Sequence, residues 1–299
     1  IANFALNIAR NNLPADYYQK YLTNLAAVDA AKVQNAAQLF LNTNQMHIVI
    51  VGNAKQIAKG LEKYGPIKYF DIEGNEVAAP TEVKADASLT PTVLMEKAIA
   101  AIGTKEALNS VKDVQLKGTA NLMGQSLEMK QTIVMPGNSV TTMSMGGMAI
   151  MRQAVVDGKY SIAQQGQEVP ITEDTKEDLD QSATLVPEQL FLTKGYGLKI
   201  VGAEKVDGKD AIDVEVTTPS KKVSHRFYDA KTFLLLKTSK SEEIPGRGTV
   251  TQQQFYSGYQ TVNGVQVSSE QLIDMGQMKI NIKYTDIKMN QGLKSSDLK

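Results

Sequence analysis

Turn signals that recur through the second half of the chain constrain its fold more than any other feature. Beyond Val111, short runs of strand-forming residues are separated by Asp157-Gly158, Asp207-Gly208 and Asn263-Gly264. Asn-Gly and Asp-Gly favour the two-residue turns of antiparallel hairpins. About eleven strand-like runs of this kind can be counted by the usual strand and turn signals. We therefore expect a large antiparallel sheet within residues 89–299.

Helical patterns accompany this sheet. Apolar residues at helical spacing predict one amphipathic helix over Thr92–Leu108. In a gap between the strand-like runs, Thr172 and the acidic residues after it resemble a capped helix start, and a second short helix is expected near Pro187–Leu192. A sheet of this size with one apolar face must curl or be covered to hide that face. We expect a half-open β-barrel with a helical cover.

The first 75 residues alternate helix and strand signals instead, which makes the whole chain α+β. The expected elements are helices over Ile1–Arg10, from Pro14 and from an N-cap at Asp29, a buried strand over Met46–Val51, a helix over Lys55–Lys63 and a strand over Ile67–Phe70. His47 would be a core histidine of the first strand. Residues 76–88 are small, polar and proline-bearing, so we interpret them as a linker between domains 1–75 and 89–299.

Composition excludes several classes of function. The chain of 299 residues is long enough for two domains, at a typical size of about 150 residues each. There is no cysteine, which removes thiolate nucleophiles, disulfides and Cys-zinc sites together. The 32 basic and 32 acidic residues balance, so net charge does not favour a nucleic-acid partner. No run approaches the ~20 apolar residues of a membrane-spanning helix.

A catalytic or metal site is not expected in this chain. It has two histidines, His47 and His225, in different predicted domains, and neither has a second histidine four residues away. Ser224 neighbours His225 on a predicted strand, so their side chains point to opposite faces. The acidic pairs Glu177-Asp178 and Glu242-Glu243 are interpreted as solvated. We expect no catalytic residue, no metal ligand and no cofactor here.

Methionines provide the one positive signal for a site. Four of the twelve methionines fall within the nine residues Met143–Met151. Methionine is flexible and polarizable and suits surfaces that accept varied apolar ligands. The pattern fits either an ordinary sheet core or the lining of an apolar cavity under the helical cover. The candidate lining residues are Met123, Met129, Met135, Met143, Met145, Met148, Phe227 and Phe255.

Residues 1–72 resemble part of a known enzyme family. Leu13-Pro14, Tyr17-Tyr18 and Ile48–Gly52 occur in an order similar to the last helices, strand and helix of an insulinase/pitrilysin-type (M16) zinc peptidase repeat. The family's His-x-x-Glu-His motif belongs to an earlier repeat and has no match here. The resemblance implies a parent zinc peptidase, or a partner subunit without zinc. Because Ile1 already lies in a helical pattern, we expect a C-terminal fragment, with zinc in the part that precedes it.

Residues 88–290 resemble the LolA/LolB-like lipoprotein carriers. The similarity lies in a leading helix, a long antiparallel meander, Phe227–Leu235 and the stretch from Tyr259 to Val265. Phe233 stands where that family usually has glycine, and Asn263 where it has aspartate. The resemblance implies a hydrophobic cavity and a periplasmic or cell-envelope location.

Two functions follow from these features. The first is an accessory domain of a peptidase that binds a lipid, a lipoprotein or a peptide substrate. The alternative is a structural module that links the peptidase to a cell-envelope partner. In both, the remainder of the parent protein or a partner subunit is an expected partner, and the isolated chain is not expected to be an enzyme.

Overall fold

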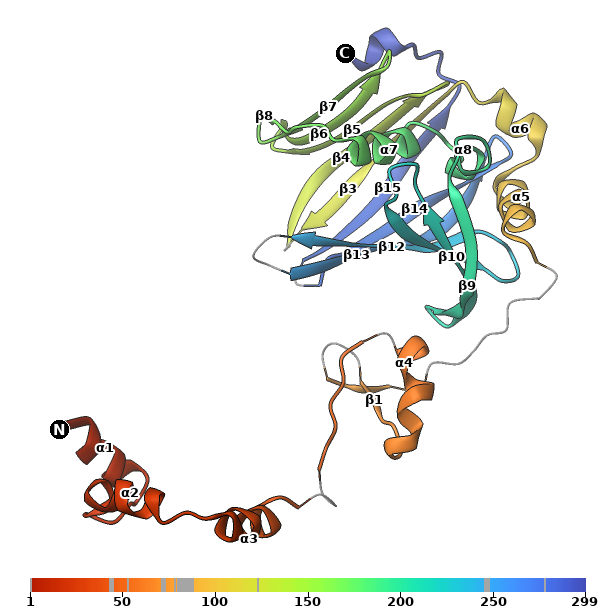
Figure 1. The fold of residues 1–299 in the computed structure, drawn as a ribbon. Coiled ribbons are helices and arrows are strands. Elements are labelled where there is room, and N and C mark those ends of the chain that lie inside the picture. The colour runs from red at the N-terminus through yellow and green to blue at the C-terminus, as the bar shows by residue number, and fades with distance from the viewer. Residues whose placement is uncertain are drawn as a thin grey trace. The chain divides into compact units, whose positions relative to one another are not determined.

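The computed structural model describes residues 2–42, 46–52, 54–70, 74–77, 79, 89–122, 124–244, 248–276 and 278–299. The chain divides into two compact units, Ile1–Val77 and Ala78–Lys299. Figure 1 shows the helices and strands of each unit.

The first unit is mainly helical. Its elements are α1 (Ala2–Arg10), α2 (Tyr17–Ala26), α3 (Ala30–Phe40), α4 (Ala54–Leu61), a 3-10 turn (Glu62–Tyr64) and the hairpin strands β1 (Tyr69–Phe70) and β2 (Glu76–Val77). The expected N-cap of α3 is confirmed, because Asp29 accepts a hydrogen bond from the Lys32 amide at 2.8 Å. The four helices therefore form where local signals place them.

Two expectations for this unit are wrong. Met46–Val51 forms no strand, and His47 is exposed and not part of a core. An extended segment needs a neighbouring strand to take its backbone hydrogen bonds, and this segment has none among the described residues of the unit. The first residues of the expected linker, Glu76 and Val77, pair with β1 instead. Most of the remaining linker, 78 and 80–88, lies outside the described residues.

The second unit contains one thirteen-stranded antiparallel sheet. Its strands are β3 (Asp113–Leu122), β4 (Gln125–Val134), β5 (Asn138–Met145), β6 (Met148–Val156), β7 (Lys159–Gln164), β8 (Gln167–Glu168), β9 (Gly197–Val206), β10 (Lys209–Thr217), β11 (Val223–Asp229), β12 (Leu235–Ile244), β13 (Gly248–Val262), β14 (Val265–Asp274) and β15 (Lys279–Met289). Its helices are α5 (Pro91–Ile102), α6 (Lys105–Ser110), α7 (Glu173–Ser182), α8 (Pro187–Thr193) and a terminal 3-10 turn (Ser295–Leu298).

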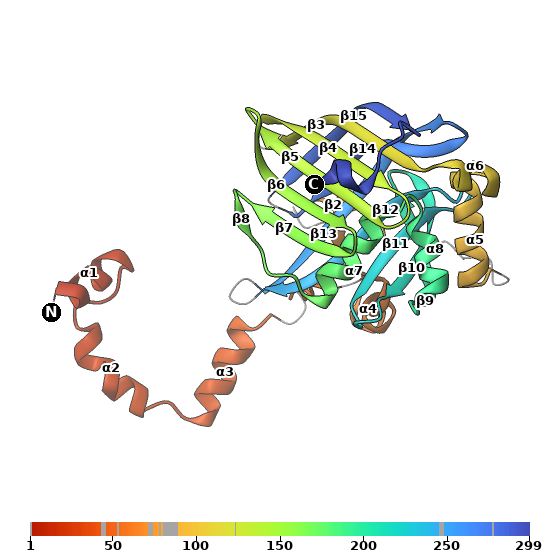
Figure 2. The same ribbon diagram turned by 90° about the horizontal axis from the view of Figure 1, so that it is seen from above.

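The sheet is a meander joined in the middle and open at its edges. Strands adjacent in sequence pair with each other except at β8 and β9, and β15 pairs with β3 in the centre of the sheet. The two edge strands, β8 and β9, do not pair, so the sheet does not close. The segment that carries α7 and α8 connects these two edges, and both helices lie within the curl of the sheet (Figures 1 and 2). The expected half-open sheet with a helical cover is confirmed.

The hairpin turns form as their sequences indicate. Both central residues have positive φ in Asp157-Gly158 (51° and 72°), Asp207-Gly208 (47° and 78°) and Asn263-Gly264 (49° and 79°). This geometry matches the right-handed twist of the strands on either side. These dipeptides therefore fix where six strands begin or end.

The helix expected over 92–108 is two helices. Gly103 leaves the helix to form an antiparallel bridge with Val265, and a Cβ at this glycine would lie 3.1 Å from the Gly264 carbonyl oxygen. Thr104 then caps α6 by accepting a hydrogen bond from the Ala107 amide at 3.2 Å. Contact with the β13–β14 turn thus overrides a continuous helical pattern. The capped start of α7 is confirmed, with Thr172 accepting from the Thr175 amide at 3.2 Å.

Candidate hydrophobic ligand site

Methionines form a band across the inner face of the sheet, which is the face that α5, α7 and α8 cover. Met129 pairs with Met143 across β4 and β5, and Met143 pairs with Met151 across β5 and β6. Directly paired residues share a face, so the three side chains adjoin. They belong to one apolar cluster that includes Leu127, Val186 and Met289. The structure thus brings together Met129 and Met143, two of the candidate lining residues. Met151 and Met289 join them, although neither was among the candidates.

The other methionine candidates lie in different places. Met135 packs against the edge of the same cluster. Met145 and Met148 flank the glycine turn between β5 and β6 and are 44% and 73% exposed. Met123 lies outside the described residues. The expected methionine lining is therefore assembled only in part, and its role in ligand binding stays a prediction.

The two phenylalanine candidates lie on the opposite face of the sheet. Arg226 and Tyr228 both reach α8, so Phe227 between them points outward. Lys237 pairs with Phe227 on one neighbouring strand and with Phe255 on the other, so the three residues share a face. Both rings belong to a separate apolar cluster with Val206 and Leu236. The structure does not bring these rings to the methionine band. Sequence alternation relates neighbours on a strand, but it does not say which face is covered.

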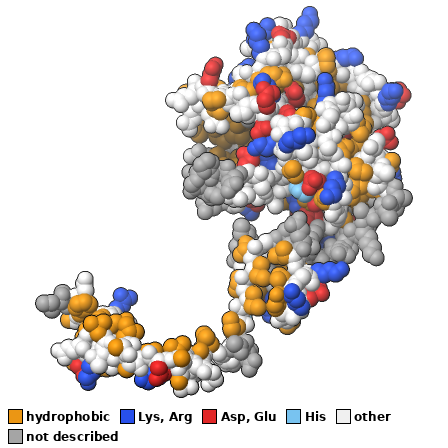
Figure 3. All heavy atoms as spheres, in the orientation of Figure 1, with side chains coloured by type: hydrophobic (Ala, Val, Ile, Leu, Met, Phe, Trp, Pro, Cys, Tyr) orange, Lys and Arg blue, Asp and Glu red, His pale blue; other side chains and the backbone are white. Residues whose placement is uncertain are grey.

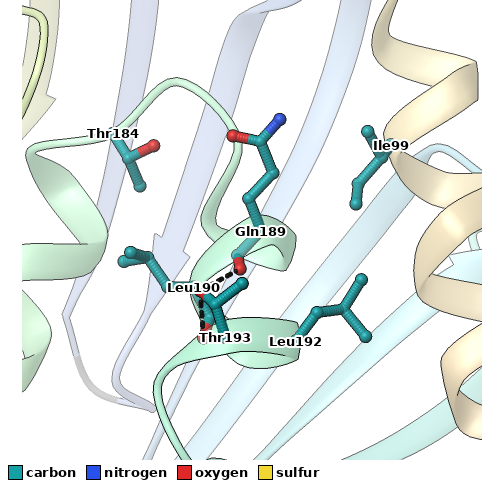
Figure 4. Close-up of a pocket in the computed structure, with 6 residues that line it drawn as sticks. All are labelled: Ile99, Thr184, Gln189, Leu190, Leu192 and Thr193. Carbon is teal, nitrogen blue, oxygen red and sulfur yellow. Dashed lines mark hydrogen bonds between the residues drawn. The ribbon is translucent and has the colours of Figure 1, made fainter. Parts of the chain in front are cut away.

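Two recesses lie beside α8. The larger, about 460 Å³, is lined by Ile99, Thr184, Gln189, Leu190, Leu192 and Thr193. Figure 4 shows Ile99 of α5 across this recess from the side chains of α8, with Thr193 hydrogen-bonded to the Gln189 carbonyl oxygen at 2.7 Å. The smaller, about 240 Å³, is lined by Leu108, Asn109, Val111, Lys112, Met135, Pro136, Leu185, Val186 and Gln189. Through Met135 and Val186, the second recess reaches the methionine cluster.

A buried polar group ties α8 to the sheet. Glu188 of α8 is 2% exposed. Its Oε1 accepts hydrogen bonds from Arg226 Nη1 at 3.0 Å and from the Tyr228 hydroxyl at 2.8 Å. The Arg226 guanidinium also lies 4.8 Å from the centre of the Phe191 ring, a cation–π contact. The buried charged pair of Glu188 and Arg226 therefore ties α8 to β11.

Burial sets the protonation of this group. Desolvation, followed by the charge of Glu188, raises the pKa of Tyr228 well above its ordinary value. Burial alone would lower the pKa of Arg226, but its electrostatic interactions with the Tyr228 hydroxyl and the Glu188 carboxylate raise this pKa overall. Tyr228 therefore keeps its proton and acts as a donor, and Arg226 keeps its charge.

This polar group was missed by sequence reasoning. Arg226 alternates with apolar residues in a strand, which is a visible signal that a charge faces one side of the sheet. Its partner Glu188 lies 38 residues away, and sequence alone does not pair them.

On the outer face of the sheet, His225 forms a pair with Asp213. His225 Nδ1 lies 2.9 Å from Asp213 Oδ1, and the imidazole stacks with Phe227 at 6.3 Å between ring centres. His225 therefore both packs against an aromatic ring and has a hydrogen-bond partner on this face. Glu177, expected to be solvated, is half-buried and accepts hydrogen bonds from the Ser220 amide at 2.9 Å and from its hydroxyl at 2.5 Å.

Among the described residues, no three histidine, aspartate or glutamate side chains gather as a metal site would need. No helix in the described ranges has the length and apolarity to cross a bilayer.

Comparison with solved structures defines the class of fold. A DUF1329 family protein from Desulfovibrio piger matches with a TM-score of 0.50 and 13% identity, over 71% of this chain and 98% of that one. Identity this low shows a shared fold and nothing further. No family model and no curated protein match the sequence.

Two further structures resemble the chain more loosely. A LolA superfamily protein from Nitrosomonas europaea has a TM-score of 0.49 and 11% identity, over 71% of this chain and 98% of its own. A putative outer membrane lipoprotein-sorting protein domain from Vibrio parahaemolyticus has a TM-score of 0.41 and 15% identity, over 68% and 95%. The comparisons lend no support to the peptidase resemblance of residues 1–72, which stays a prediction.

Proposed function

We propose that residues 89–299 are an accessory domain that binds a hydrophobic ligand on the inner face of the half-open barrel. The observation that carries this proposal is the pair of recesses beside α8, the smaller of which reaches the methionine cluster. The larger recess, at about 460 Å³, is of the size of small-molecule sites, which span on the order of 300–1,000 Å³. A lipid, the acyl chain of a lipoprotein or an apolar peptide segment would fit this chemistry.

The cover of this face suits an exchangeable ligand. It consists mainly of three short helices, and α8 has only seven residues. The methionines beneath can adopt many rotamers at low cost, so the surface can adapt to chains of different shape. The sheet itself supplies a rigid frame through its continuous strand pairing.

The test is binding of a fluorescent fatty-acyl probe to the full chain. We expect saturable binding that Ile99→Lys weakens at least tenfold, because the substitution places a charge in the larger recess. Ala100→Lys, at the next and exposed position of α5, is the matched control and should bind as the original chain does. An absence of saturable binding for every acyl chain would show that the domain has another role.

A docking function is the second candidate. The β5–β6 tip, with Met145 and Met148, exposes apolar side chains beside two glycines. Such a tip suits contact with a cell-envelope partner. Under this alternative, Met148→Ser would abolish association with the envelope fraction and leave acyl-probe binding unchanged.

The peptidase parent is proposed on narrower ground. No described residue of the first unit is buried, and its helices carry exposed apolar side chains such as Leu22 and Leu39 (Figure 3). These stripes suit packing against further parts of an M16-type protein, where zinc would be bound, in the periplasm. Peptide cleavage by that longer protein, abolished by a chelator and altered on removal of residues 89–299, is the expected result.

A further inference from the structure

Lys112 places a positive charge at the smaller recess. Among the described residues that line the two recesses, it alone carries a charge, and the others are apolar or neutral polar residues. Its ammonium group donates a hydrogen bond to the Asn109 carbonyl oxygen at 3.0 Å and forms no ion pair with any described carboxylate. An ammonium has three N–H donors, so two of them remain available to a ligand.

The backbone puts this charge at the rim of the apolar inner face. The Met135 amide donates a hydrogen bond to the Lys112 carbonyl oxygen at 2.8 Å, which continues the pairing of β3 with β4 by one residue beyond Asp113. Residues two apart on a strand share a face, so Lys112 is in line with Val114 and Leu116, which are buried in the methionine cluster. Lys112 itself is exposed, and it lies where this apolar row ends.

No described acidic residue lines either recess to balance the charge. Asp113, the next residue, points to the other face, and its two oxygens already accept hydrogen bonds from three amides that follow β15. Asn109 and Gln189 also line the smaller recess, and their side-chain amides make no hydrogen bond to a described residue. The rim therefore combines a cation with neutral amide donors, which suits an oxyanion.

We propose that Lys112 binds the anionic head, a carboxylate or a phosphate, of an amphiphile whose apolar chain fills the smaller recess. This inference rests on the proposed hydrophobic ligand site and names its ligand class. Met135 and Val186 line the recess and contact the methionine cluster, so the chain would lie between the charge and that cluster. A cationic head would meet a like charge at Lys112, and a neutral head would lack the ionic part of the hydrogen bond.

Ligands with one chain and different heads test this on the full chain. An eight-carbon chain suits the recess, because about 240 Å³ holds roughly eight groups of the size of a water molecule, at ~30 Å³ each. Octanoate, octyl phosphate, octanol and octyltrimethylammonium each compete with an apolar fluorescent probe, below the concentrations at which they form micelles. We expect both anions to bind at least fivefold more tightly than octyltrimethylammonium, and the tighter anion identifies the head.

The outcomes separate this inference from the proposed function. Equal affinities of the four ligands, or tighter binding of the cation, would overturn the anionic head and leave the apolar site standing. A probe that binds but is displaced by none of the four would overturn the smaller recess as the place of the chain. A probe that does not bind at all would overturn both the inference and the proposed function.

Variants of Lys112 locate the preference. Lys112→Gln removes the charge from an exposed side chain and should weaken octanoate binding at least fivefold, with octanol binding changed less than twofold. Lys112→Arg keeps the charge and should retain the preference for anions. Lys105→Gln makes the same change at an exposed position of α6 that lines neither recess, so it should bind all four ligands as the original chain does. Unchanged octanoate binding in Lys112→Gln would show that the head binds elsewhere and would overturn the proposal.

Discussion

Among the described glycines, Gly118 leaves the least room for a side chain. A Cβ at this position would lie 1.9 Å from the Lys283 carbonyl oxygen, next to the irregularity in β15 between Tyr284 and Asp286. Gly118→Ala would push β3 and β15 apart, and we expect it to lower the free energy of unfolding by about 3 kcal/mol, the upper end of the usual cost of overpacking. Urea unfolding measures this. Lys117→Ala, on the exposed neighbour, should change it by less than about 0.5 kcal/mol. Equal unfolding midpoints for the two variants would contradict the close approach.

Asp113 fastens the segment that follows β15. Its side chain is 0% exposed and accepts hydrogen bonds from the amides of Gln291, Gly292 and Leu293 at 2.9–3.1 Å. Asp113→Ala would leave these amides unpaired, and we expect a loss of roughly 3 kcal/mol in thermal or urea unfolding. Asp113→Asn keeps one acceptor oxygen and should cost less. Limited proteolysis should cut the last ten residues faster in the alanine variant. An unchanged rate would mean that the hydrogen bonds of Asp113 do not hold this segment in place.

His225 should make a small, pH-dependent contribution to stability. The hydrogen bond that His225 Nδ1 donates to the Asp213 carboxylate raises the pKa of His225 above its ordinary value of 6.5, although burial opposes this. A raised pKa means that the protonated form is favoured in the fold. The contribution is therefore fully present below pH 6.5 and is lost as pH rises through the folded pKa. The stability difference between the original chain and His225→Gln should be larger at pH 5.5 than at pH 8.5. A difference that grows with pH would reverse the assignment.

Single residues also show where sequence reasoning stops. Arg226, not Phe227, faces α8, and nothing in the alternation of β11 says which of the two faces is covered. Glu188 follows Pro187 at a helix start, a position that acidic residues commonly occupy on exposed helices. Its burial follows from the position of α8 against β11, which is a tertiary fact.

At the scale of elements, the N-cap of α7 can be weakened without disturbing the sheet. Thr172→Ala removes the hydrogen bond to the Thr175 amide, at a cost of about 1 kcal/mol. We expect amide hydrogen exchange in α7 to become about fivefold faster, as that free energy implies. Exchange in β3–β5 serves as the internal control. Uniform acceleration across the sheet would mean that α7 and the sheet open as one unit.

Elements with local causes were predictable and elements with distant causes were not. Asp29 and Thr172 cap helices through amides three residues away, and Asp157-Gly158 turns through its own φ angles, so each signal is complete within a few residues. The break at Gly103 depends on Val265, far along the chain. The segment over 46–51 has strand-like composition but no neighbouring strand. A sequence pattern indicates which secondary structure a segment can form, and contacts with distant segments determine whether it forms.

At the scale of the whole molecule, the second unit should fold without the first. It buries its own core, and no described residue of 1–77 is buried. We expect residues 78–299 to unfold in one cooperative calorimetric transition, with a midpoint within about 2 °C of the sheet transition in the full chain. Residues 1–77 alone should show no such transition. A large drop in the midpoint of 78–299 would mean that the first unit contributes to its stability.

The architecture was predictable as a class and not as a topology. Turn spacing and the helical gap indicate a half-open sheet with a cover, and that is what forms. The pairing of β3 with β15 leaves no mark in either strand, because any amphipathic strand could pair there. The polar centre of the site depends on where α8 lies, and so it could not be predicted either.

The central pairing of β3 with β15 also determines when the sheet can be completed during synthesis on the ribosome. The strands from β3 to β8 emerge first, yet β3 waits for a partner that is the last strand of the sheet to be made. Until β15 is synthesised, the nascent chain exposes an unpaired strand edge and apolar surface, and both features promote aggregation with other chains. A nascent chain that stops before β15 would thus have paired strands on both sides of the sheet without the β3–β15 pairing that joins them.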